Sequence, residues 1–165
     1  MLASIAILAA MELSSPAFAA DGEIPARFTC DGANVSPPLT WKDAPSGTKS
    51  FALVVSDPDA PDPKAPKTTW THWVLYGLPG DMHGLREAVP AKALPQGSLE
   101  GKNDWGKTGY GGACPPIGRH RYVHTLYALD VSLADLGGPS RTDLLKAMEG
   151  HVLAEAALVG TYQRQ

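Results

Sequence analysis

Residues 121–131 read RYVHTLYALDV, and their side chains alternate along the run between two sets. One set is Tyr122, His124, Leu126 and Ala128, and the other is Val123, Thr125, Tyr127 and Leu129. A period of two places each set on one face of a β-strand. Trp70 to Leu78 (WTHWVLYGL) alternates in the same way, and Phe51 to Val55 (FALVV) is a compact run of strand-forming residues. We therefore expect three clear strands, with the run at 51–55 buried.

The remaining sequence favours turns and loops. The 165 residues include 17 Gly and 15 Pro, a share well above that of an average chain. Four prolines in DPDAPDPKAP (57–66) exclude a helix there and predict a stiff loop after the first strand. Residues 21–49 predict short strands between turns, and residues 79–118 have little regular pattern. An irregular stretch as long as residues 79–118 usually contains functional residues.

One helix is expected near the C-terminus. Ser140 and Asp143 resemble a capping box, with Asp replacing the usual Glu. A helical stripe follows at Leu144, Leu145, Met148 and Val152. A short last strand is expected over 158–162. The pattern predicts a mainly β domain with antiparallel strands, one C-terminal helix and few short helices.

The first 19 residues have the pattern of a secretory signal peptide. An uncharged apolar run from Leu2 to Met11 precedes Ala17-Phe18-Ala19, a small-x-small cleavage site. We expect cleavage after Ala19, a single domain over 20–165 and an exported, periplasmic or secreted protein. An ordinary apolar N-terminal helix is the alternative. The run is too short to span a membrane, which takes about 20 residues, so we expect no transmembrane segment.

Export bears on the two cysteines, Cys30 and Cys114, which belong to no C-x-x-C pair. In an oxidising compartment they can form one disulfide, whereas two separately buried thiols are the alternative.

Charge and motifs exclude several functions. Lys and Arg number 14 and Asp and Glu 17, a net charge of −3 without any basic block, which argues against nucleic-acid binding. Residues 101–108 (GKNDWGKT) fit the phosphate-loop pattern by letter. That loop needs a strand before it and a helix after it, and the following GYGGACPP permits no helix. The sequence contains neither a G-x-S-x-G serine motif nor an H-E-x-x-H zinc motif.

Polar side chains near the strand ends predict a small-molecule site. The candidates are Asp57, Asp59, Trp70, His72, His120 and Tyr122. A carboxylate beside imidazole fixes its tautomer and favours the cation, and imidazole and phenol donors suit a phosphate or another tetrahedral anion. Structural alternatives remain open for these residues. Asp57 can cap a turn, and Asp57 or Asp59 can pair with Arg121. Trp41 and Trp105 are expected to be core or loop anchors.

Several segments together resemble the phosphatidylethanolamine-binding protein family, and more closely its bacterial Raf-kinase-inhibitor-like branch. The matching segments are FTCDGANVSPPLTW (28–41), DPDAP (57–61), WTHW (70–73), GYGG (109–112), CPPIGRHRY (114–122) and VGTY (159–162). The resemblance runs from about residue 24 to 163. It departs at Ala113, where the bacterial branch commonly has proline before the cysteine.

This resemblance implies an antiparallel β-sandwich-like fold with a small pocket for phosphate or phosphoethanolamine-like anions. The pocket residues that it implies are Asp57, Asp59, Trp70, His72, Cys114, Pro115, Pro116, His120 and Tyr122. We expect a non-enzymatic binding protein without a cofactor or a metal. A second hypothesis is a regulator that inhibits a partner protein such as a kinase or a protease. A third is a metal-dependent hydrolase using His72, His120 and Asp57.

Overall fold

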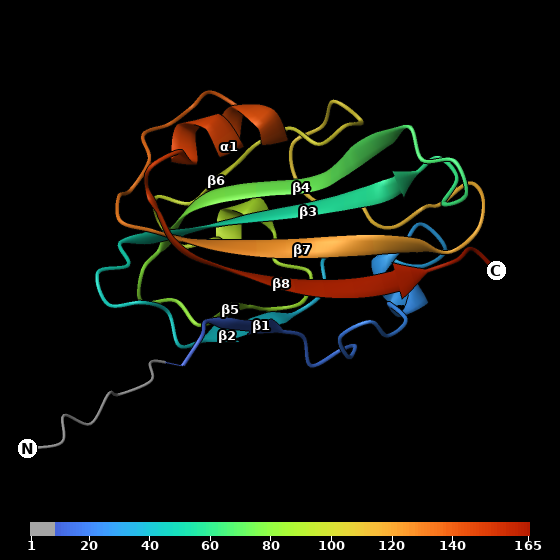
Figure 1. Cartoon of the computed structure of the whole chain (residues 1–165), viewed down its shortest axis with the longest axis horizontal. Helices are drawn as coiled ribbons and strands as arrows, with labels where there is room; N and C mark the ends of the chain where they lie inside the picture. The colour runs from blue at the N-terminus through green and yellow to red at the C-terminus, as the bar shows by residue number, and fades with distance from the viewer. Residues whose placement is uncertain (1–8) are drawn as a thin grey trace, which may run out of the picture.

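Two antiparallel sheets and one helix form three layers in the computed structural model, which describes residues 9–165 (Figure 1). The larger sheet has five strands in the order β6-β4-β3-β7-β8, and the smaller sheet has the order β1-β2-β5. Helix α1 covers one face of the larger sheet and the small sheet faces the other (Figure 1). The expected mainly β, antiparallel, sandwich-like fold is confirmed.

The elements and their bounds, in chain order, are β1 (Glu12–Ser14), the 3-10 helix η1 (Ala26–Phe28), β2 (Leu39–Lys42), β3 (Ser50–Ala60), β4 (Thr68–Pro79), β5 (Gly84–Leu85), the 3-10 helix η2 (Ala91–Ala93), β6 (Leu99–Glu100), β7 (His120–Leu129), α1 (Arg141–Met148) and β8 (Val152–Tyr162).

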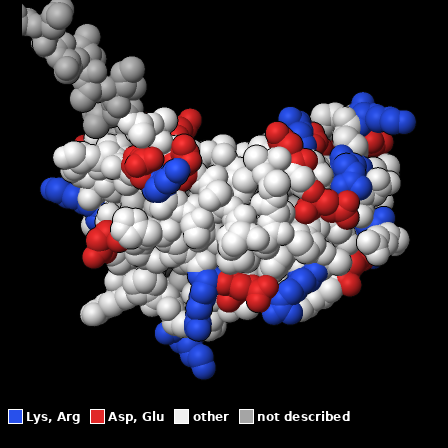
Figure 2. Space-filling model, turned by 90° about the horizontal axis from the view of Figure 1, so that it is seen from below, with Lys and Arg blue, Asp and Glu red and all other residues white. Residues whose placement is uncertain are grey.

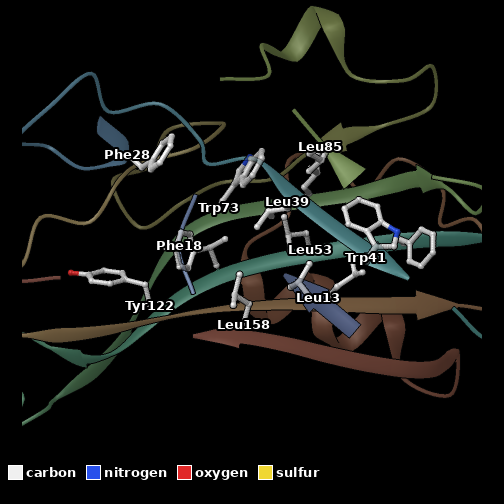
Figure 3. Packing of buried hydrophobic residues seen from close by; sticks show 14 of the residues in the cluster. Leu13, Phe18, Phe28, Leu39, Trp41, Leu53, Trp73, Leu85, Tyr122 and Leu158 are labelled. Atoms are coloured by element: carbon white, nitrogen blue, oxygen red, sulfur yellow. The ribbon is translucent and has the colours of Figure 1, made fainter. Parts of the chain in front are cut away.

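The alternation along β3 supplies two hydrophobic cores. Leu53 and Val55 pack in the larger core between the two sheets, together with Trp41 and Trp73 (Figure 3). Ala52 and Val54 pack on the opposite face, against Leu144 and Met148 of α1. Burial on both faces explains why the sequence of this strand is an uninterrupted apolar run.

Strand β3 is longer than its apolar run indicated. It continues through Asp57, Pro58 and Asp59 to Ala60, where the sequence predicted the start of a loop. The pairing of β3 with β4 shifts register between Asp57 and Ala60. Such an irregularity lets a strand contain a proline, because the residue there need not donate to the ladder. The polar end of β3 is therefore held in the sheet.

Helix α1 begins as predicted and ends earlier. The Ser140 side chain accepts from the Asp143 backbone N–H at 3.1 Å, and the Asp143 carboxylate accepts from the Ser140 N–H at 3.2 Å, which completes the capping box. Gly150 has φ of +79° and breaks the predicted helical stripe. Val152 consequently starts β8, which is longer than the expected strand at 158–162.

The N-terminal segment takes part in the fold. Strand β1 pairs with β2, and the side chains of Met11, Leu13 and Phe18 are only 7–8% exposed in the larger core. Residues 1–8 of the predicted signal peptide lie outside the described residues. Cleavage after Ala19 stays a prediction, and it would remove β1 and three core side chains.

Cys30 and Cys114 form a disulfide, which settles the alternative that the sequence left open. Next to it, the Cys30 backbone N–H donates to the Ala113 carbonyl at 3.0 Å, so the segment before the cysteine is fixed in spite of the missing proline. Within residues 9–165, no helix is long and apolar enough to cross a membrane. On the face seen in Figure 2, acidic and basic side chains are interspersed around an uncharged centre.

Candidate functional site

The C-terminal end of β3 meets the first residues of β4 and β7 at one end of the larger sheet, because both neighbours are antiparallel to it. A cavity of about 260 Å³ opens there. Its walls are formed by Asp57, Ala60, Pro61, Trp70, His72, Trp105, Cys114, Pro115, Pro116 and Tyr122. Three strands and the loop after β6 thus contribute to one hollow.

Asp57 and His120 form a buried pair under this cavity. His120 Nδ1 lies 2.7 Å from Asp57 Oδ2, and His120 Nε2 lies 2.8 Å from the Ile117 carbonyl oxygen. The Ile117 carbonyl oxygen can only accept, so Nε2 donates to it, and Nδ1 faces the Asp57 carboxyl group. Both ring nitrogens of His120 are therefore engaged within the protein, so neither is free for a ligand or for the metal ion of the metal-dependent hydrolase hypothesis.

Asp59 is also engaged beside the cavity. Its carboxylate accepts from Arg121 Nη2 at 2.7 Å, from Arg121 Nε at 3.0 Å and from the Arg121 backbone N–H at 2.9 Å. These hydrogen bonds hold the pKa of Asp59 below its usual value. The ion pair that the sequence left as an alternative is present, and it joins β3 to β7.

Tyr122 and Trp70 supply two buried donors that have no partner. Among the residues described, Tyr122 Oη and Trp70 Nε1 are both buried without a hydrogen-bond partner, and both residues line the cavity. In Figure 3 the Tyr122 hydroxyl points away from the other labelled core side chains. Burial and the nearby Asp57 carboxylate raise the pKa of Tyr122, so its hydroxyl keeps its proton.

His72 is fixed by the loop that follows β6. Its Nδ1 lies 2.7 Å from the Gly111 carbonyl oxygen, which makes Nδ1 the protonated nitrogen of the neutral ring. Burial lowers the pKa of His72, and the ring is therefore neutral at pH 7. The His72 ring meets the Tyr122 ring edge-on at 5.2 Å between centroids, and the His120 ring lies nearly parallel to the Tyr122 ring at 6.4 Å.

The structure brings most of the predicted site residues together. Those that line the cavity are Asp57, Trp70, His72, Cys114, Pro115, Pro116 and Tyr122. Asp59 and His120 do not line it and instead hold its walls. Ligand binding by any of these residues stays a prediction.

Trp105 was expected to be a core or loop anchor, whereas it is 44% exposed and forms part of the cavity wall. Its ring centroid lies 5.0 Å from that of His72 and 5.5 Å from that of Trp70. The signal was the long irregular stretch at 79–118, which pointed to function without naming a residue. Ala60 and Pro61 were missed as well, although they directly follow Asp59.

Similar proteins cover almost the whole chain. A UPF0098 protein of Methanothermobacter thermautotrophicus is 53% identical over 155 residues, which are 93% of this chain and 99% of that protein. The crystal structure of CT736 of Chlamydia trachomatis, a putative phosphatidylethanolamine-binding protein homologue, has a TM-score of 0.87 at 40% identity and covers 94% of this chain and 99% of its own.

A second solved structure, that of YbcL of Escherichia coli, has a TM-score of 0.85 at 30% identity and covers 95% of this chain and 100% of its own. The family model described as phosphatidylethanolamine-binding protein matches residues 14–163, beginning upstream of Ala19. With this match over most of its length and with the same fold, the chain belongs to the phosphatidylethanolamine-binding protein family.

Proposed function

We propose that this protein binds, without chemical conversion, a small ligand that carries a phosphate-like anion, and that the anion enters the cavity between β3, β4 and β7. Family membership supports a binding protein in general. The cavity residues support the finer assignment of phosphate or a phosphoethanolamine-like group.

The observation that carries this proposal is the pair of unpartnered donors, Tyr122 Oη and Trp70 Nε1. A buried donor without a partner costs about 1–3 kcal/mol, and a ligand oxygen that accepts from it recovers this cost. A tetrahedral anion has several acceptor oxygens in a small volume, which suits two donors that line the same hollow.

Asp57 and His72 extend the same chemistry. The Asp57 carboxylate lines the cavity, and an ammonium group of a phosphoethanolamine-like ligand is a suitable partner for it. When His72 takes up a proton, its Nε2 becomes a third donor, and a bound anion favours that protonated form. Anion binding and proton uptake by His72 are therefore coupled in this proposal.

Tyr122→Phe tests the proposal, because it removes the hydroxyl and keeps the ring. Inorganic phosphate is expected to raise the Tm of the wild-type protein and to give a measurable Kd by calorimetry. Tyr122→Phe should weaken phosphate binding by about tenfold, the equivalent of about 1.4 kcal/mol for one lost hydrogen bond to an anion.

Tyr127→Phe is the matched control. Tyr127 lies on the same strand and packs on the opposite face, near α1. An equal loss of phosphate affinity in both variants, or no binding of phosphate to the wild type at millimolar concentration, would contradict the proposal.

We also propose that the protein works outside the cytoplasm. The disulfide between Cys30 and Cys114 supports this placement, because such bonds persist in oxidising compartments. Fractionation of cells that express the full chain, with N-terminal sequencing of the product, tests it. Recovery with reduced cysteines from the cytoplasm alone would refute it.

A further inference from the structure

A second cavity, of about 280 Å³, lies next to the first one. Its walls are formed by Cys30, Asn34, Asn103, Trp105, Lys107, Thr108, Tyr110, Gly111, Gly112 and Cys114. The two cavities share Trp105 and Cys114 as lining residues. Trp105 and Cys114 therefore lie between two hollows that open beside each other.

Hydrogen bonds hold the loop backbone at Trp105, whereas its side chain is partly exposed. Asn103 is buried, and its Oδ1 accepts from the backbone N–H groups of Trp105 and Lys107, each at 3.1 Å. Its amide nitrogen donates to the Gly109 carbonyl at 3.0 Å, which closes the loop. The indole itself is held by edge contacts with Trp70 and His72 and is 44% exposed.

Gly111 gives the indole its place between the cavities. A Cβ added at Gly111 would collide with the six-membered ring of Trp105. The same residue accepts from His72 at its carbonyl. The Gly111 backbone thus contacts the Trp105 indole and also orients His72, which lines the first cavity.

Neither cavity alone reaches the lower end of the range of ligand pockets, which begins at about 300 Å³. Together they lie within that range. The first cavity holds the unpartnered donors of Tyr122 and Trp70. Lys107 is the one charged side chain among the described lining residues of the second cavity, which include no carboxylate. Thr108 adds a hydroxyl group to the same lining.

We propose that the two cavities are subsites of one binding site, that Trp105 is the movable partition between them, and that the second subsite takes an anionic group of the same ligand. The ligand class is a phosphomonoester that carries a second oxyanion, such as a carboxylate or another phosphate. This inference rests on the proposed function, because the phosphate of that ligand occupies the first cavity.

Three probes test it by calorimetry at constant ionic strength: inorganic phosphate, O-phosphoethanolamine and 3-phosphoglycerate. The wild-type protein should bind 3-phosphoglycerate more tightly than either of the others. Lys107→Ala should weaken 3-phosphoglycerate binding about two- to fivefold, the range of an exposed ion pair, and leave phosphate binding unchanged. Lys102→Ala is the control, since Lys102 lies in the same loop outside the lining of both cavities.

Fluorine NMR of protein labelled with 5-fluorotryptophan reports the partition directly, with the Trp105 signal assigned from Trp105→Phe. Only 3-phosphoglycerate should shift that signal strongly, whereas phosphate alone should shift mainly Trp70. Equal affinities for phosphate and 3-phosphoglycerate, a preference for O-phosphoethanolamine, or an unchanged 3-phosphoglycerate affinity in Lys107→Ala would overturn the inference and leave the proposed function standing. Failure of all three probes to bind would overturn both.

Discussion

Removal of residues 9–19 should unfold the domain or leave it barely stable. A chain that starts at Ala20, the product of the predicted cleavage, lacks β1 and the side chains of Met11, Leu13 and Phe18. A chain that starts at Ala9 keeps all of them. Comparison of these two chains isolates what residues 9–19 contribute.

The size of the effect follows from burial. Met11, Leu13 and Phe18 are 8%, 7% and 7% exposed in the core between the sheets. Burying one such side chain stabilises a fold by about 1.5–3 kcal/mol, so the three contribute about 5–9 kcal/mol, an upper estimate because unfolded chains are partly compact. A typical domain has a total of only about 5–15 kcal/mol. The loss therefore approaches the whole free energy of unfolding.

Urea unfolding followed by tryptophan fluorescence and far-ultraviolet circular dichroism measures it. The chain from Ala9 should unfold in one cooperative transition, and the chain from Ala20 should show a far lower midpoint or no transition. Phe18→Ala in the full chain should cost about 3–5 kcal/mol, with the exposed Ser14→Ala as control. Equal midpoints for the two truncated chains would refute the reasoning and would make cleavage after Ala19 structurally harmless.

Three further predictions concern pH and the disulfide. Burial lowers the pKa of His124 to about 4, below its value of about 6.5 in the unfolded chain. The stability that depends on the neutral His124 ring is therefore fully present above pH 6.5 and is lost as the pH falls. The free energy of unfolding should drop by about 3 kcal/mol between pH 7 and pH 4, and His124→Leu should make this drop smaller. Sulfate keeps a constant charge between pH 8 and pH 6, and it should bind more tightly as the pH falls over this range because an anion favours protonated His72. In calorimetry, the sulfate affinity of His72→Gln should not change with pH. The same pH dependence in His72→Gln as in the wild type would contradict the coupling. Replacing both Cys30 and Cys114 by Ser should lower stability in urea by about 2–4 kcal/mol, and no difference would mean that the bond constrains neither state.

The strands were predictable where the sequence has a strict period. Residues 121–129 alternate over most of β7, and the structure keeps both faces as the pattern assigned them. The boundary of β3 was missed because Pro58 normally ends a strand, whereas a register irregularity here accommodates it. Strand β1 was missed because residues 1–19 were interpreted together as a leader, and the three residues of Glu12–Ser14 are too few to show a strand period.

The site was predictable in composition and less so in role. The motifs placed Asp57, His72 and Tyr122 together, but no spacing in the sequence shows which nitrogen of a histidine is already bonded. His120 was expected to donate to a ligand, and its partners are Asp57 and the Ile117 carbonyl. Trp105 was out of reach, because its position depends on the fold of an irregular loop.

The different roles of His120, Tyr122 and His124 follow from their positions along β7. Period two directs His120, Tyr122 and His124 to the same inner face, at increasing distance from the loop end of the strand. His120 is held by the end of β3, and His124 is enclosed in the core, where its Nδ1 lies 3.2 Å from the Tyr122 carbonyl oxygen. Tyr122, between them, has a buried hydroxyl without a hydrogen-bond partner. The contacts from β3 to His120 and Arg121 occupy the polar groups on either side of Tyr122, and a ligand that accepts a hydrogen bond is the partner that the Tyr122 hydroxyl lacks.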